Sequence, residues 1–227
     1  MLNLKSYGKR GKSNPHSYLI IGCGHFGSRA AEKLFQKDPH SKIIVVDQSK
    51  KALLKVSHLS IESTICEGTL YLKQFLSEGR KADYIIPAVP FHLVFEFIHS
   101  QLKPLGGKRR KVPPLSGLSN PMIGKTGDLY TSLANFLCSE DCPEPSQYCT
   151  ITKKRRPKPL YQILNNLEGP FESKVIRSLQ LAPGVGGFKP EALLALLEDI
   201  KRKKNSGRSI LVSTASLCHG VTSALSF

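Results

Sequence analysis

The chain has 227 residues, of which 40% are hydrophobic, and it carries a formal net charge of +16. This length allows one large domain or one domain with an insertion, and the apolar content excludes an extended disordered chain. The most apolar stretch, residues 83–98, is interrupted by proline and charge and is too short to span a membrane, while residues 1–15 lack the apolar core of a signal peptide. We therefore expect a cytoplasmic protein.

Much of the positive charge lies in three blocks, at residues 108–111, 153–156 and 201–204. Solvated loop ends and helix ends account for such blocks, because cations are favourable at the C-terminus of a helix. None of the blocks contains the interleaved aromatic residues of a surface that stacks on bases. The pattern therefore argues against nucleic acid as a partner.

The stretch from Tyr18 to Asp47 begins as an apolar strand, passes through Gly22, Gly24 and Gly27 into a helical pattern, and closes on a second strand. In a dinucleotide-binding unit the first glycine permits a tight turn, the second lets the backbone approach a pyrophosphate, and the third lets helix and strand pack closely. The amides at the start of the helix face the phosphates. The alternative is a glycine-rich turn in an α/β domain that binds no ligand.

Asp47 stands at the tip of the second strand, 20 residues after Gly27. This is the separation at which a carboxylate accepts hydrogen bonds from the ribose hydroxyls of a bound dinucleotide. A 2′-phosphate would meet a negative charge there, so the sequence favours NAD over NADP.

Strand and helix patterns continue to alternate after Asp47. Residues 49–56 and 70–77 are expected to be helices, and residues 58–65 and 84–89 are expected to be strands. This alternation is typical of a parallel sheet with helices on its faces.

The runs IIGCGHFG, VVD, CEGT and SEGRKADYIIPAV resemble the nucleotide-binding domain of TrkA-type potassium-transport regulators, also called RCK or KTN domains. The resemblance covers about residues 17–100 and departs from the family at His25, where arginine is frequent. It implies a homo-oligomeric NAD-binding regulator that associates with itself or with a membrane transporter. The matching positions are Gly22, Gly24, Gly27, Asp47, Glu67, Gly68, Ala82 and Asp83. The nucleotide contacts that the resemblance and the loop pattern imply are Gly22, Gly24, His25, Phe26, Gly27, Asp47, Gln48, Glu67, Gly68, Thr69, Ala88 and Val89.

Three of the six cysteines, Cys138, Cys142 and Cys149, lie within twelve residues, and Cys218 is the fourth candidate of a set. In a cytosolic chain such clusters more often bind metal or carry out redox chemistry than form disulfides. Four thiolates would close a structural zinc site or hold an iron–sulfur cluster, and the spacing does not choose between the two. The remaining alternative is four unrelated thiols.

Cys218 and His219 follow an apolar strand expected at residues 209–215. If this strand joins the sheet of the glycine loop, the cysteines lie on the nucleotide side, because ligands bind beyond the carboxyl ends of parallel strands. Cys218 and His219 are the catalytic candidates, although no nucleophile motif accompanies them. Cys23 and Cys66 are expected to be packing residues.

The pattern of the second half of the chain also predicts strands and helices. Helices are expected at residues 130–137 and 160–167, a strand at 174–181, and a further helix after Pro190. The glycine-rich residues 184–187 are interpreted as a tight turn between strand and helix, with an anion site at the helix start as the alternative.

These patterns predict a doubly wound, mostly parallel Rossmann-like sheet of six or seven strands with a cysteine-bearing insertion. The expected units are a leader at 1–16, a Rossmann core at 17–103, the insertion at 104–170, and a C-terminal βαβ unit at 171–227 that completes the sheet. The first functional hypothesis is an NAD(H)-binding regulator of the TrkA type with a cysteine-ligated metal. The second is an NAD-dependent oxidoreductase with an iron–sulfur or zinc centre at the four cysteines.

Overall fold

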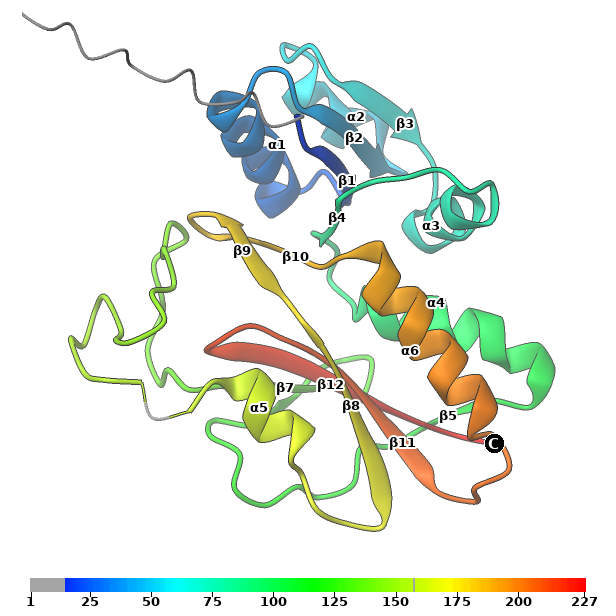
Figure 1. The fold of residues 1–227 in the computed structure, drawn as a ribbon. Coiled ribbons are helices and arrows are strands. Elements are labelled where there is room, and N and C mark those ends of the chain that lie inside the picture. The colour runs from blue at the N-terminus through cyan, green and yellow to red at the C-terminus, as the bar shows by residue number, and fades with distance from the viewer. Residues whose placement is uncertain (1–14, 157) are drawn as a thin grey trace, which may run out of the picture.

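The computed structural model describes residues 15–156 and 158–227, which form a four-stranded sheet, a six-stranded sheet and a two-stranded hairpin, with helices packed on the faces of the two larger sheets (Figure 1). The expected α/β class is confirmed, while residues 1–14 of the expected leader lie outside the described part. The first sheet has four parallel strands in the order β3-β2-β1-β4. Its strands and helices are β1 (Ser17–Ile21), α1 (His25–Lys37), β2 (Lys42–Asp47), α2 (Lys50–Leu53), β3 (Glu62–Ile65), α3 (Gly68–Ser77) and β4 (Tyr84–Pro87).

Continuous apolar runs place β1 and β2 at the centre of this sheet, since a parallel strand covered on both faces needs apolar residues at every position. Helix α1 buries Ala30, Ala31 and Leu34 on one face, and α3 buries Leu72 and Phe75 on the other. The carboxyl ends of β1, β2 and β4 therefore meet at one edge, where the glycine loop begins.

The second half of the chain forms a separate mixed sheet of six strands. Its main order is β6-β7-β12-β11-β8, and β5 pairs with the remaining part of β12. The elements of this half are α4 (Leu93–Leu102), β5 (Lys108–Arg110), β6 (Met122–Ile123), β7 (Leu129–Ser132), α5 (Leu160–Asn165), β8 (Phe171–Arg177), β9 (Leu179–Ala182), β10 (Val185–Gly187), α6 (Pro190–Arg202), β11 (Ser209–Ala215) and β12 (His219–Ser226).

The sequence led us to expect that the C-terminal strands complete the first sheet. This expectation is wrong, because these strands belong to the second sheet. The reason is that β11 pairs in parallel with β8 and antiparallel with β12, so both of its edges are occupied within the second sheet. Two further expectations were wrong for related reasons. Residues 130–137 do not form a helix, because residues 129–132 pair with β12, and the final strand β12 itself was not anticipated.

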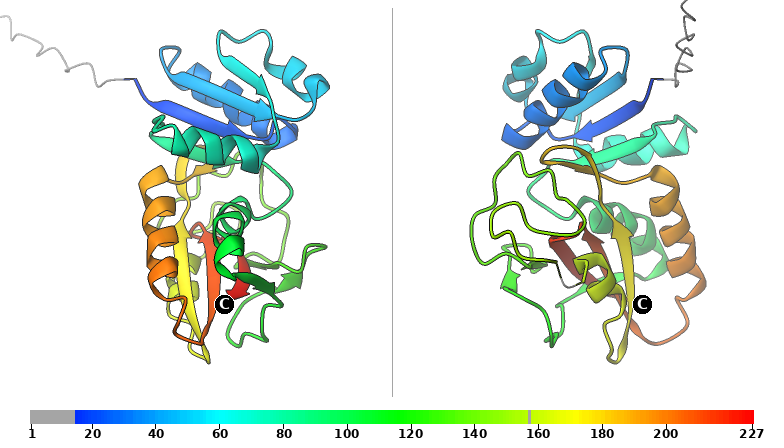
Figure 2. Two further views of the ribbon diagram at one scale, coloured as in Figure 1. Left: turned by 90° about the vertical axis from the view of Figure 1, so that its right-hand side faces the viewer. Right: turned by 60° about the vertical axis from the view of Figure 1, so that its left-hand side comes forward.

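Helices cover both faces of the second sheet (Figure 2). Helices α4 and α6 contribute to one core cluster with Ile210, Val212 and Leu225 of the sheet. Helix α5 packs on the opposite face through Leu160 and Leu164. None of the helices in the described residues combines the length and apolarity needed to cross a bilayer.

The antiparallel hairpin of β9 and β10 connects the two sheets. Phe188, which follows β10, forms an isolated antiparallel bridge with Ile85 of β4. The Ile85 amide donates to the Phe188 carbonyl at 2.8 Å, and the Phe188 amide donates to the Ile85 carbonyl at 2.9 Å. Leu181, Ala182 and Val185 of the hairpin are buried in the same cluster as α1. The hairpin thus extends the α1 face of the first sheet beyond β4.

A buried polar network connects α4 to the second sheet. His92, which precedes α4, is 3% exposed, with Nδ1 at 2.8 Å from the Ser223 hydroxyl and Nε2 at 2.9 Å from the Thr214 hydroxyl. The Ser223 hydroxyl donates to the fully buried Asp128, which also accepts from Arg109 at 2.9 Å. Burial is the main reason that the pKa of His92 falls to about 3. His92 is therefore neutral in the folded protein.

The neutral state of His92 predicts that acid destabilises the fold. Below the ordinary pKa of 6.5 the unfolded chain binds a proton that the native state does not bind. The free energy of unfolding should then fall by about 1.4 kcal/mol per pH unit from this residue alone. Urea unfolding at pH 7.5, 6 and 5 should show a flatter dependence for His92→Asn than for the wild type, whereas the exposed His40→Asn control should keep the wild-type slope. Equal slopes for all three proteins would contradict this role.

Candidate functional site

The glycine loop has the geometry that the sequence predicts. Gly22 has φ +100°, and a Cβ atom there would lie 2.3 Å from the Ala88 carbonyl oxygen. A Cβ on Gly27 would lie 1.9 Å from the Gly22 carbonyl oxygen, so both residues are required by close packing. A Cβ on Gly24, in contrast, would meet no heavy atom of the described residues within 4 Å. The second glycine therefore faces open space, as a backbone that approaches a pyrophosphate must.

The start of α1 has no cap or acidic side chain from its own residues. The 13-residue helix is capped by Gly24, whose position supplies no side-chain hydrogen bond, and its first turn contains no acidic residue. The first amides and the helix dipole therefore present partial positive charge beside the open Gly24 position. Phe26 in this first turn is 62% exposed.

Asp47 lies against the glycine loop. One carboxylate oxygen accepts from the Cys23 amide at 2.7 Å, and the other accepts from the Ser49 amide at 2.8 Å. These bonds fix the carboxylate at the carboxyl end of β2. Each oxygen keeps a further lone pair for a hydroxyl donor. Asp47 thus fits the expected ribose contact, and Gln48 beside it is exposed.

The other expected nucleotide contacts lie around the same edge, and several of them have roles in the fold. The Glu67 carboxylate caps α3 by accepting from the Thr69 and Leu70 amides at 2.9 and 2.7 Å. A Cβ on Gly68 would lie 2.4 Å from a methyl group of Ile21, so glycine is needed for close packing. Ala88 and Val89 follow β4, next to Gly22.

The four cysteines predicted as metal ligands all line one pocket of about 690 Å³. Cys138, Cys142 and Cys149 come from the loop between β7 and α5, which lies beside the hairpin below α1 in Figure 1, and Cys218 comes from the turn between β11 and β12. Across residues 15–156 and 158–227, no three side chains of His, Cys, Asp or Glu are arranged so that they could hold a metal ion together. The thiols thus converge on the pocket without forming a coordination sphere.

Glu144 holds the two parts of this set together. One oxygen of its carboxylate accepts from the backbone amides of Leu217 and Cys218 at 2.9 and 3.2 Å and from the Ser216 hydroxyl. Glu144 itself has φ +46°, an uncommon conformation for a residue other than glycine. The cysteine-bearing loop is thereby fixed to the turn that presents the fourth thiol.

The tip of the hairpin supports the cysteine-bearing loop from below. The Gly184 amide donates to the Cys142 carbonyl at 3.0 Å, and a Cβ on Gly184 would lie 1.7 Å from the Glu140 carbonyl oxygen. Residues 184–187 were interpreted as a tight turn between a strand and a helix, but Gly184 lies in the turn between two strands and residues 185–187 form β10. Gly184 is needed for the close approach of the loop.

The thiols differ in their electrostatic surroundings. The backbone N–H and the hydroxyl of Thr152, together with the Ile151 N–H, hold the pKa of Cys149 below its usual range. Burial raises the pKa of Cys138, and it raises the pKa of Cys218 to about 11. Donors around a thiolate are what the outer shell of a metal site supplies. Of Cys138, Cys149 and Cys218, Cys149 is thus the thiol that most readily becomes a thiolate, the form that binds a metal.

The catalytic candidates also line this pocket, but they lack a catalytic arrangement. His219 Nδ1 lies 3.1 Å from the Ser132 hydroxyl, whereas Ser216 donates to Glu144 and Ser213 pairs with Thr222. The serine hydroxyl at the His219 imidazole is therefore that of Ser132, whereas the hydroxyls of Ser213 and Ser216, which lie nearer to Cys218 in the chain, are bonded to other groups. Cys23 is buried as expected, and Cys66 packs against the core.

The cysteine pocket reaches the glycine loop. Its lining includes Phe26 from the first turn of α1, Gly184 and Gly186 from the hairpin, and the side chain of Arg156. Arg156 donates to the Pro145 carbonyl at 2.8 Å and supplies positive charge near the thiols. Sequence patterns did not single out Glu144, and they placed Arg156 and Gly184 only within a basic block and a glycine-rich turn, because the role of each residue arises from contacts between distant segments.

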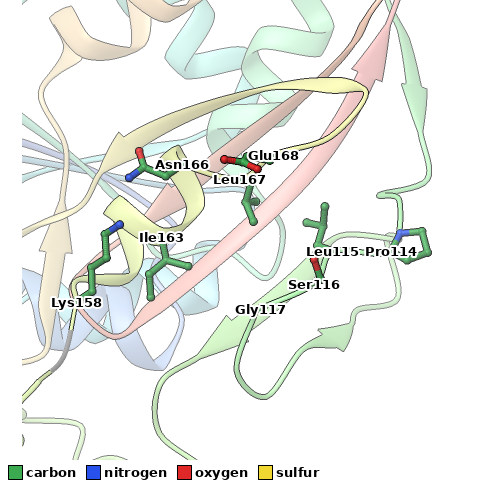
Figure 3. A pocket seen from close by; sticks show the side chains of 9 residues that line it. All are labelled: Pro114, Leu115, Ser116, Gly117, Lys158, Ile163, Asn166, Leu167 and Glu168. Atoms are coloured by element: carbon green, nitrogen blue, oxygen red, sulfur yellow. The ribbon is translucent and has the colours of Figure 1, made fainter.

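A second cavity, of about 330 Å³, lies between residues 114–117 and the segment around α5 (Figure 3). Its side chains include Leu115 on one side and Ile163 and Leu167 on the other, with Glu168 at the rim. None of the cysteines or expected nucleotide contacts lines it, so the candidate site is the cysteine pocket with the adjoining glycine loop.

Fold and site together define an α/β protein with a Rossmann-type N-terminal sheet and a cysteine-lined pocket on a second, mixed sheet. The family described as "Uncharacterized protein, C-terminal domain" matches residues 94–227, so the chain belongs to this family. The match begins within α4, at the start of the second sheet's own elements. The chain is also similar to an uncharacterized protein of Archaeoglobus fulgidus, with 27% identity over 224 residues that cover 91% of this chain and 98% of the relative. That similarity extends over both sheets.

The thiol environments predict an order of chemical reactivity. In reduced protein treated with a chelator, limiting iodoacetamide at pH 7.5 should alkylate Cys149 before Cys138 and Cys218, because only the thiolate reacts. A pKa near 11 leaves Cys218 with a thiolate fraction on the order of 100-fold below that of an ordinary thiol. Peptide mass spectrometry would give the order, and Cys149→Ser should remove the fastest phase. Earlier labelling of Cys218 would contradict the assignment.

Proposed function

We propose that the protein binds NAD(H) at the glycine loop and holds a thiolate-ligated metal centre in the adjoining pocket. The observation that carries this proposal is the convergence of Cys138, Cys142, Cys149 and Cys218 on one pocket that also includes Phe26 of the glycine-loop helix. The open position at Gly24 and the carboxylate of Asp47 support the dinucleotide part. Thiolate ligands need a reducing compartment, so a cytoplasmic location belongs to the same proposal.

The strand order supports a path for the dinucleotide toward the cysteines. In the order β3-β2-β1-β4, the chain adds β2 and β3 on one side of β1 and then returns to add β4 on the other side. In parallel sheets of this kind, a dinucleotide binds across the point where the strand order switches sides. Asp47 on β2 would take the adenosine ribose. The other half would then extend over β4, on the side where the hairpin and the cysteine pocket lie.

In the first candidate function, the protein is a regulator that responds to the bound nucleotide. As in the TrkA-type regulators that residues 17–100 resemble, bound nucleotide would bias a conformational or assembly equilibrium. Pairing with a second copy, or with a membrane transporter, belongs to this proposal. The metal would then stabilise the loop that carries three of its ligands.

The position of the pocket favours an NAD-dependent oxidoreductase as the second candidate. A nicotinamide ring over β4 would approach the cysteine pocket and would transfer its hydride, which carries two electrons, to a substrate in the same pocket. An iron–sulfur centre at the four thiols would hold or polarise that substrate and would not accept the hydride itself. A zinc centre at the same thiols would have a structural or substrate-positioning role instead.

Metal analysis tests the centre. Protein purified without oxygen should contain either stoichiometric zinc and no colour, or iron with sulfide and a broad visible absorption. Cys218→Ser should lose most of this metal, whereas Cys66→Ser, which removes a thiol outside the pocket, should retain it. The absence of any metal in the wild type, or equal metal in both variants, would contradict the proposed centre.

NADH titration tests the dinucleotide site. Because the Gly24 position is open, Gly24→Val should keep the wild-type melting temperature but weaken NADH binding by about tenfold or more, corresponding to about 1.4 kcal/mol. Wild-type protein should bind NADH more tightly than NADPH, owing to Asp47. Gly27→Ala is a contrasting variant, since its Cβ would collide with the backbone and lower the melting temperature. Unchanged NADH affinity in a folded Gly24→Val protein would refute the assignment.

A further inference from the structure

Two residues between Cys138 and Cys142, Glu140 and Asp141, contact side chains in the first turns of α1. The Glu140 carboxylate contacts His25 Nε2 at 2.9 and 3.0 Å, and it lies 3.5 Å from Arg29 Nε. His25 is the first residue of α1. A carboxylate from the cysteine-bearing loop therefore stands beside the helix start, where the helix itself provides no acidic residue.

Asp141 docks the same loop further along α1. Its carboxylate accepts from Arg29 Nη2 at 2.7 Å and pairs with Lys33. Lys33 also donates to the Pro183 carbonyl of the hairpin at 2.6 Å. The two acidic residues thus attach one short segment to three basic side chains of α1.

The placement of Glu140 opposes a bound diphosphate. An anion near the start of a helix is favourable, and a second anion at the same place meets repulsion. Glu140 also engages His25, and together with Asp141 it engages Arg29, so that neither basic side chain is free to face phosphate oxygens. Docking of the loop and binding of a dinucleotide therefore compete for the same positive end of α1.

We propose that Glu140 couples the cysteine pocket to the dinucleotide site, so that the docked loop weakens dinucleotide binding. The proposal rests on the function proposed above and specifies its regulation. Cys138 and Cys142 flank Glu140, so a metal bound to these thiols holds the carboxylate on α1. By thermodynamic linkage, metal loading lowers dinucleotide affinity, and the dinucleotide lowers metal affinity by the same factor.

The test compares NADH binding by the wild type, Glu140→Gln and Glu168→Gln. Glu168 is an acidic residue of the separate cavity in Figure 3, so its substitution makes the same change in net charge away from α1. At low salt Glu140→Gln should bind NADH about three- to tenfold more tightly than the wild type and the control. The gain should shrink at high salt, because ions screen exposed charges.

The second arm adds Zn²⁺ as the metal probe. Saturating the wild type with Zn²⁺ should weaken NADH binding, and Glu140→Gln should lose most of this effect. If the wild type binds NADH and Glu140→Gln binds it with equal affinity, the coupling is refuted while the dinucleotide site stands. Binding by Glu140→Gln alone would support strong coupling. Absence of NADH binding in every protein would overturn both proposals.

Discussion

The pair of backbone hydrogen bonds between Ile85 and Phe188 determines how the two sheets meet. Ile85 belongs to the edge strand β4, and Phe188 is fully buried in a core cluster that continues from Leu19 in the first sheet to Leu225 in the second. Because these bonds fix the hairpin of β9 and β10 beside β4, the turn at Gly184 supports the cysteine-bearing loop. The thiols lie close to the glycine loop through this attachment, through the packing of the hairpin against α1, and through the ion pairs of the cysteine-bearing loop with α1.

The sequence predicts those parts of the fold that are encoded locally. The elements from β1 to β4 each have their own apolar pattern and stand within a few residues of their expected positions, because each βαβ connection is short and its glycines are specific. The second sheet depends instead on pairing between distant segments. Strand β12, with the sequence HGVTSALS, has little apolar periodicity and is buried by its neighbours rather than by its own composition. Because the sequence does not predict β12, it gives β11 no partner in a second sheet and leads to the prediction that β11 joins the first sheet.

In the candidate site, too, the sequence predicts the residues that have a distinctive local signal and misses those whose role depends on distant contacts. Cysteine is chemically distinctive, so the sequence identifies four thiols that the fold places in one pocket, although 69 residues separate Cys149 from Cys218. Glu144 was missed, and Gly184 was predicted only as part of a tight turn, because an acidic residue and a glycine in a loop have many uses. Their roles arise only when the loop, the hairpin and the β11–β12 turn come together. Glu67, in contrast, was expected at the nucleotide and has a capping role that its position before α3 provides.

The four thiols differ in mechanical support. Cys218 belongs to a tight connection between β11 and β12, each of which is paired on both sides, whereas the other three thiols lie on a long loop attached mainly by Glu144, Gly184 and ion pairs to α1. Such a loop opens locally at a much lower free energy than the sheet unfolds. A centre bound by these ligands would therefore exchange at a rate set by loop opening, with one thiol left in place to receive the next ion. The time for which a metal ion stays bound would then be set separately from the time for which the protein stays folded.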